Sequence, residues 1–172
     1  MFRSTARGAV MTALAAAALA APAMTATATT DPGQHQIVPV HSGKCLDVLG
    51  ANPGDDTNIV QSTCDGRVSQ RFSAKSAGND TWLILSEATL KCFQATPAGQ
   101  EGGDVVQRTC DGSPVQRWRV EGEAAHGYQV VSGLTGLCLE VAYASPEDGA
   151  EVRQYPCHGQ ANQRFSFDGV PA

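Results

Sequence analysis

The sequence predicts an all-β protein in which one unit is used three times, and three observations support this prediction. A Gln-Arg-aromatic triplet occurs at residues 70–72, 116–118 and 163–165. One cysteine lies six residues before each Gln, and a second cysteine lies 18 or 19 residues before that cysteine. The whole pattern recurs every 46 or 47 residues. Within each copy, short β-prone runs alternate with Gly, Pro, Asp and Asn turns, and no helical pattern occurs.

The first 28 residues do not follow this pattern. Arg3 and Arg7 precede an Ala-rich apolar run over residues 8–21, and small residues with Ala-x-Ala spacing end at Ala23 and Ala28. This order of charge, apolar run and small residues is typical of a secretory signal. The apolar run is too short and too Ala-rich for a membrane anchor. We therefore expect a secreted, extracellular protein that is cleaved after Ala28, with Ala23 as the alternative.

The remaining chain of about 144 residues is long enough for one domain with its own core. It loses Arg3 and Arg7, so its formal charge is −7 instead of −5. An acidic domain lacks the basic face that phosphate groups require, which argues against nucleic acid or an anionic membrane surface as the partner. No later segment is long and apolar enough for membrane insertion, and no particular oligomer is predicted.

All six cysteines fall within the repeat. Six cysteines allow 15 pairings, but a threefold repeat is expected to use the same bridge in each copy. The predicted disulfides are Cys45–Cys64, Cys92–Cys110 and Cys138–Cys157. Each closes a loop of about 20 residues and contributes about 3 kcal/mol on the chain-entropy model. A metal site is a poor alternative, because no Cys-x-x-Cys occurs and the four histidines lack ligand spacing.

Four short strands are expected in each copy, which makes twelve in all. A short N-terminal segment over residues 29–35 precedes the repeats, which span about 36–81, 82–127 and 128–168. The first copy has β-prone runs at 36–40, 45–48, 59–61 and 70–74, separated by turns such as Asp65-Gly66. Equivalent runs are 82–85, 92–95, 105–107 and 116–120 in the second copy, and 128–131, 138–141, 152–154 and 163–167 in the third.

Period-two alternation predicts which way the strand side chains point. Inward positions are Leu46, Val48, Phe93, Ala95, Leu139 and Val141 on the cysteine strands, and Phe72, Ala74, Trp118, Val120, Phe165 and Phe167 after the triplet Gln. Outward positions are Asp47, Gln94 and Glu140, together with Arg71, Arg117 and Arg164 as solvated cations. Gln70, Gln116 and Gln163 share the buried face, so we expect each amide to bind a neighbouring turn backbone.

One such repeat cannot cover its own apolar face, and no capping repeat is present. Closure of the three copies about a threefold axis is therefore favoured over an open array. A propeller requires at least four blades. The expected architecture is a β-trefoil.

The combined pattern of Cys-Leu-Asp-Val, a Gly-rich loop, Cys-Asp-Gly and Gln-x-aromatic, repeated three times, resembles the ricin B-chain type (R-type, Q-x-W) lectin domain. The resemblance covers residues 36–168 and implies a β-trefoil that binds carbohydrate. Each lobe of such a domain keeps or loses its sugar pocket independently, so the resemblance is more specific for the fold than for the activity.

The resemblance also implies which residues form a pocket. It places an acidic residue after Cys-Leu, an aromatic platform two residues before the second cysteine, a polar residue four before it, and an Asn before the Gln. An aromatic ring stacks on the C–H face of a sugar, while a carboxylate and an amide bind its hydroxyls. The third copy supplies Glu140, Arg153, Tyr155 and Asn162. Glu140 departs from the usual Asp, and Arg153 replaces the usual Gln.

The other copies match less well. The first keeps Asp47 but has Ser62 at the platform and Ser69 at the amide position, and the second has Gln94, Arg108 and Val115. We therefore expect one main pocket, in the third copy, for a galactose- or xylose-like sugar or polysaccharide. Asp47 remains a secondary candidate.

Other motifs in the sequence give little support to a different function. Asp55-Asp56 and Glu147-Asp148 could suggest paired catalytic carboxylates or a calcium loop, but turn chemistry explains them more simply. No nucleophile or phosphate-binding motif is present, so no enzyme activity, cofactor or metal is predicted. The main alternative is a trefoil that has lost sugar binding and acts by protein–protein contact, for example as a protease inhibitor.

Overall fold

The computed structural model describes residues 33–96 and 99–167, which form twelve strands and five short 3₁₀ turns without an α-helix in those ranges. The strands are β1 (Ile37–Pro39), β2 (Cys45–Val48), β3 (Thr57–Ser62), β4 (Phe72–Gly78), β5 (Thr81–Ser86), β6 (Cys92–Thr96), β7 (Asp104–Arg108), β8 (Trp118–Glu123), β9 (Gly127–Ser132), β10 (Cys138–Val141), β11 (Val152–Tyr155) and β12 (Phe165–Phe167). The all-β prediction is confirmed. The predicted signal and cleavage sites lie outside the described residues.

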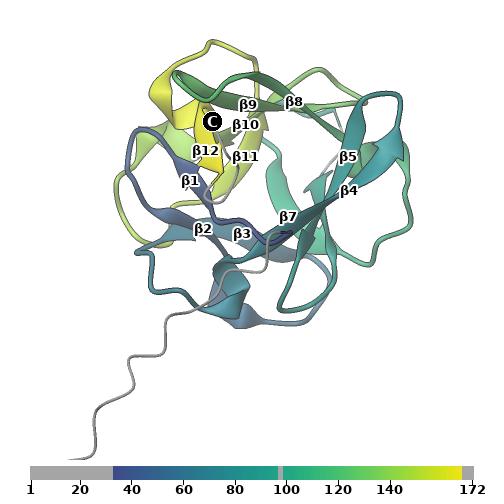
Figure 1. Ribbon diagram of the computed structural model, residues 1–172, viewed down its shortest axis with the longest axis horizontal. Coiled ribbons are helices and arrows are strands. Elements are labelled where there is room, and N and C mark those ends of the chain that lie inside the picture. Colours follow the sequence, from purple (N-terminus) through teal and green to yellow (C-terminus); the bar gives the residue numbers. More distant parts are fainter. Residues whose placement is uncertain (1–32, 97–98, 168–172) are drawn as a thin grey trace, which may run out of the picture.

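Six of the strands close into a ring. β4 pairs with β5, β8 with β9, and β12 with β1, in each case antiparallel. β5–β8 and β9–β12 pairs join these couples, and a bridge between His35 and Phe72 closes the circle. Figure 1 shows the couples arranged around the molecule. The ring therefore has no terminal strand at its centre, although single residue pairs join the neighbouring couples.

The other six strands form three antiparallel hairpins, β2–β3, β6–β7 and β10–β11, which we call the first, second and third hairpin. The predicted disulfides are confirmed, since Cys45–Cys64, Cys92–Cys110 and Cys138–Cys157 are bonded. Each bridge joins the start of one hairpin strand to the residues that follow its partner. The bridge therefore fixes the hairpin end that leads into the Gln-containing turn.

The core lies between the ring and the hairpins. It contains one aromatic side chain from the start of each of β4, β8 and β12, and one apolar pair from each of β2, β6 and β10. Phe72 and Phe93 pack edge to face with their centroids 5.0 Å apart, and the Trp118 indole donates a 3.2 Å hydrogen bond to the Phe93 carbonyl. The inward positions on the cysteine strands are buried as predicted.

The predicted inward–outward alternation of side chains fails two residues beyond the core aromatic of ring strands β4 and β8. Ala74 is exposed, Val120 is 37% exposed, and Phe167 is only partly buried. The prediction that these three positions point into a closed core was wrong for Ala74 and Val120, because their strands run beyond the packed centre of the ring. There they line an apolar hollow with Trp82 and Tyr128.

Buried glutamines connect the hairpins to one another. The Gln61 amide donates to the carbonyls of Ser145 and Glu147 at 2.7 and 2.9 Å. Gln107 makes the same pair of bonds to Asn52 and Gly54, at 2.8 and 2.9 Å. Both side chains, like that of Gln154, are fully buried. The Gln61 and Gln107 amides thus bind loop carbonyls that would otherwise remain unpaired. Within 33–96 and 99–167, no helix has the length and apolarity needed to cross a membrane.

Candidate functional site

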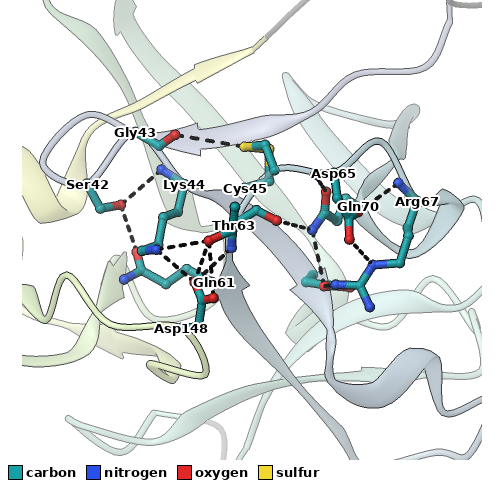
Figure 2. The surroundings of a disulfide bond; sticks show 12 residues. Ser42, Gly43, Lys44, Cys45, Gln61, Thr63, Asp65, Arg67, Gln70 and Asp148 are labelled. Carbon is teal, nitrogen blue, oxygen red and sulfur yellow. Dashed lines mark hydrogen bonds and ion pairs between the residues drawn. A yellow bond between two sulfur atoms is a disulfide. The ribbon is translucent and has the colours of Figure 1, made fainter. Parts of the chain in front are cut away.

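The triplet glutamines organise the base of each hairpin. Gln70, Gln116 and Gln163 are fully buried, as predicted, but they lie at the ends of 3₁₀ turns and not within strands. The Gln70 carbonyl oxygen accepts from the Asp65 amide at 3.0 Å, and its NH₂ donates to the Thr63 carbonyl at 2.9 Å (Figure 2). Gln116 and Gln163 repeat this pair of bonds. The predicted role as ties to the turn backbone is confirmed.

The polar residue after Cys-Leu does not point into solvent. Asp47 is 4% exposed and Glu140 only 2%, so the outward orientation predicted for them was wrong. The 3₁₀ turn that carries the triplet Gln packs over this face of the hairpin and places the Gln amide on the carboxylate. Arg117 and Arg164 also depart from the prediction, since both donate to a turn carbonyl, of Gly112 and Gly159, instead of extending freely into water.

The carboxylate of the third hairpin is saturated with donors. Arg153 donates to Glu140 Oε1 through Nε at 3.2 Å and through Nη2 at 2.8 Å. Glu140 Oε2 accepts from Gln163 Nε2 at 2.8 Å and lies 2.8 Å from His158 Nε2. His158 Nδ1 accepts from the Gln160 amide, which assigns the ring proton to Nε2. Four donors therefore hold one buried carboxylate.

Two tyrosines contact the same guanidinium. The Arg153 Cζ lies 4.4 Å from the ring centroid of Tyr143 and 4.7 Å from that of Tyr155. Although desolvation opposes it, the bonds to Glu140 raise the pKa of Arg153 above its ordinary value. A hydrogen bond to the Glu101 carboxylate raises the pKa of the Tyr155 phenol. The Arg153 charge thus lies between a buried anion and two aromatic rings.

The structure brings together three of the four residues predicted for the third copy. Glu140, Arg153 and Tyr155 meet on β10 and β11, where Glu140 pairs directly with Arg153 across the hairpin. Asn162 lies beside them but is 5% exposed, and its amide donates to the Val141 carbonyl at 3.1 Å. Its side chain therefore holds the hairpin to the 3₁₀ turn, and one of its two amide N–H groups is already hydrogen-bonded within the chain.

Tyr143 and His158 complete this cluster and were not predicted. Tyr143 follows β10 at a sharp bend and is 85% exposed, with φ 57° and ψ 17°. A left-handed conformation costs a side-chain-bearing residue about 1–2 kcal/mol, whereas an exposed cation–π contact returns only about 0.5–1 kcal/mol. His158 takes the place of Asp65 and Asp111 in the Cys-Asp-Gly turn, and this departure from the repeat was the signal that could have identified it.

The first hairpin holds its carboxylate more loosely. Asp47 Oδ2 accepts from Arg67 at 3.2 Å and from Gln70 at 3.3 Å, while buried Oδ1 has no partner. Ser62 takes the position of Tyr155, and the Ser69 hydroxyl is buried without a partner. In the second hairpin Gln94 accepts from Gln116 at 3.2 Å, and Arg108 forms an ion pair with Asp56. Neither hairpin carries an aromatic platform.

Acidic loop residues tie two hairpins to their neighbours. Asp148 accepts from Lys44 at 2.8 Å and from the Thr63 amide at 2.8 Å (Figure 2). Asp55 pairs in the same way with Lys91 and the Thr109 amide. Hydrogen bonds to Lys44 and Lys91 lower the pKa values of Asp148 and Asp55. The loops predicted from turn chemistry alone therefore also make contacts between hairpins. Among the described residues, no group of three or more His, Cys, Asp or Glu could hold a metal ion.

The geometry defines a class of protein. Three disulfide-bridged hairpins sit on a closed ring of strands, and one hairpin presents aromatic rings, a guanidinium and an imidazole around a buried carboxylate. Aromatic faces beside hydrogen-bonding groups suit a ligand with apolar C–H faces and many hydroxyls. These features are those of a saccharide-binding domain.

The chain belongs to the ricin-type β-trefoil lectin domain family, whose model matches residues 33–165. This membership shows the predicted family and supports carbohydrate binding in general. No curated protein matches the chain.

Solved structures share the fold. The designed threefold-symmetric protein ThreeFoil is 29% identical, with a TM-score of 0.76 over 78% of this chain and 97% of that one. An exo-β-1,3-galactanase from Clostridium thermocellum is 27% identical, with a TM-score of 0.76 over 80% of this chain but only 30% of the enzyme. The C-half of the earthworm R-type lectin, in complex with GalNAc, is 22% identical, with a TM-score of 0.65 over 79% of this chain and 98% of that one.

Proposed function

We propose that this chain is a secreted, non-catalytic carbohydrate-binding protein that takes its sugar mainly at the third hairpin. One observation carries the proposal: Glu140, Arg153 and Tyr155, predicted from three separate positions of the repeat, meet in one cluster together with Tyr143 and His158. Only this hairpin combines a carboxylate with an aromatic platform in the described part of the chain. The Ala-rich leader supports secretion.

Four side chains of the cluster have a part in the primary sugar site. Tyr155 offers a ring for the C–H face of the sugar. Glu140 orients Arg153 and His158, whose edges reach the surface, with side chains 14% and 31% exposed. The Arg153 contacts with Glu140 use Nε and one Nη2 hydrogen, and the Tyr143 side chain also hydrogen-bonds this guanidinium, which leaves two N–H groups to bind sugar hydroxyls. Glu140 acts as a positioning group, and Tyr155, Arg153 and His158 contact the sugar.

The first sugars to test are galactose-like. The galactanase and the GalNAc-bound earthworm lectin among the similar structures are named for galactosyl substrates or ligands. Xylose-like sugars form the second class. A single shallow site implies modest affinity, because it buries little of the ligand.

The test is a glycan array on the oxidised chain, followed by retention of variants on a matrix of the best sugar. Tyr155→Ala is expected to abolish retention while lowering the melting temperature by no more than a few degrees, since the ring lies at the surface. The matched control is Ser62→Ala, at the equivalent position of the first hairpin, which should bind like wild type. Equal retention of Tyr155→Ala and wild type would remove the third hairpin from the proposal.

A second candidate is a trefoil without sugar binding that acts through protein–protein contact, for example as a protease inhibitor. It is favoured by the saturation of Glu140, whose two oxygens are already held by the chain's own donors. An array without any hit at high ligand density would support this alternative and contradict the carbohydrate proposal.

A further inference from the structure

The bend after β10 carries an aromatic side chain that the bend itself does not require. Tyr143 has φ 57° and ψ 17°, and Gly50, at the equivalent bend after β2, has φ 61° and ψ 17°. Both bends continue with an alanine at positive φ, Ala144 and Ala51. Glycine adopts this conformation without strain. The shape of the loop is therefore the same with or without the phenol ring.

Packing does not explain the ring either. Tyr143 is 85% exposed, and among the described residues its ring stacks on Arg153 alone, to which its side chain also hydrogen-bonds. Arg153 is already fixed by Glu140 and stacked on Tyr155. Strain and exposure do not mark a binding residue by themselves, because Leu90 has φ 57° and is 69% exposed without lying near the cluster. Tyr143 differs because its ring adjoins the guanidinium of the proposed site.

The two tyrosines approach Arg153 from different elements. Tyr143 comes from the bend after β10, and Tyr155 from the end of β11. Each ring lies within 4.7 Å of the same guanidinium carbon. One pyranose ring stacked on Tyr155 would leave the largely exposed face of Tyr143 available to a neighbouring sugar unit. Stacking on an exposed aromatic ring depends on the apolar face of a sugar and adds contact area beyond the first unit.

We propose that Tyr143 binds a second sugar unit, so that the third hairpin recognises oligosaccharides of at least two residues in preference to a monosaccharide. This inference rests on the proposed carbohydrate-binding function and specifies the ligand class of the same site. Tyr143 is the residue that confers the preference for chain length, and Tyr155 serves the unit next to the carboxylate cluster.

The experiment compares wild type and Tyr143→Gly by titration calorimetry with two ligand series: galactose, galactobiose and galactotetraose, and xylose, xylobiose and xylotetraose. Wild type is expected to bind the dimer and tetramer of one series at least tenfold more tightly than its monomer. Tyr143→Gly should lose this difference while retaining monomer affinity, and its melting temperature should stay within a few degrees of wild type. The matched control is Leu90→Gly, which replaces another exposed residue with φ 57° away from the site and should keep wild-type binding.

The outcomes separate the two proposals. If Tyr143→Gly keeps the full preference for longer chains, the role of Tyr143 is overturned while the carbohydrate-binding function stands. If wild type binds monomer and oligomer equally, the preference for oligosaccharides is overturned, and the carbohydrate-binding function still stands. If wild type binds none of the six sugars and shows no hit on the array, both proposals fail. Loss of the preference in Leu90→Gly as well would attribute it to general loop changes and overturn the inference.

Discussion

The first and third hairpins have the same backbone and differ in how they treat a buried carboxylate. In both, the triplet Gln donates to the acid, at 3.3 Å for Asp47 and 2.8 Å for Glu140. Asp47 keeps one oxygen without a partner and is reached by an exposed arginine from the following turn. Glu140 is saturated, and its arginine comes from the paired strand and stacks on two tyrosines. The shared repeat therefore builds the scaffold, while residues outside the repeat pattern decide what each hairpin can do.

The largest expected difference between the two hairpins is in stability. Glu140→Gln keeps the size of the side chain but leaves Arg153 without a counter-charge in a mostly buried position, which costs about 3–5 kcal/mol for a broken buried pair. Asp47→Asn removes a carboxylate with weaker and fewer contacts, and we expect the free energy of unfolding to fall by about 1 kcal/mol. Urea unfolding at neutral pH measures both. Equal losses would mean that the additional donors around Glu140 contribute nothing to folding.

A smaller difference is expected when the triplet glutamines are replaced. Gln163→Leu and Gln116→Leu lose the same backbone ties, but Gln163 also donates to the Glu140 carboxylate, whereas Gln116 donates to the neutral amide of Gln94. Hydrogen bonds to charged groups contribute about 1 kcal/mol more than neutral ones. Gln163→Leu should therefore be the less stable variant by about that amount in the same unfolding measurement. The reverse order would contradict a charge-assisted bond in the third hairpin.

The repeat made the scaffold predictable from sequence, because identical spacing in three copies fixes the disulfides, the buried triplet Gln and the apolar alternation together. It also contained a signal that was not used: a Gln lies three residues before the second cysteine in every copy, and Gln61 and Gln107 bind the loop of a neighbouring hairpin. The burial of Asp47 and Glu140 could not be read from alternation, because the covering turn reaches them through tertiary packing. Tyr143 was not identified either, since the equivalent bend of the first copy carries Gly50 and the repeat pattern assigns no role to this position.

The smallest expected effect concerns the ties that Asp148 and Asp55 make, because the Lys and Thr residues that bind them have no counterpart in the third hairpin. Leu137 and Pro156 stand where the first hairpin has Lys44 and Thr63, and proline has no amide hydrogen to donate. Elsewhere, the hydrogen bond to Lys44, supported by Thr63, lowers the pKa of Asp148 in the folded protein. A group with a lowered folded pKa stabilises the protein above its unfolded pKa of about 4, and this contribution is lost as the pH falls through the folded value.

Asp148→Asn should therefore lower the melting temperature slightly at neutral pH, and this difference should shrink as the pH falls through the lowered pKa of Asp148 in the folded protein. Asp55→Asn should behave in the same way at the other tie, and Asp80→Asn, on the exposed β4–β5 turn, serves as the control. Differential scanning calorimetry across this pH range measures the effect. If the gap between wild type and Asp148→Asn stays constant from neutral to acid pH, the contribution of this residue does not arise from its charge.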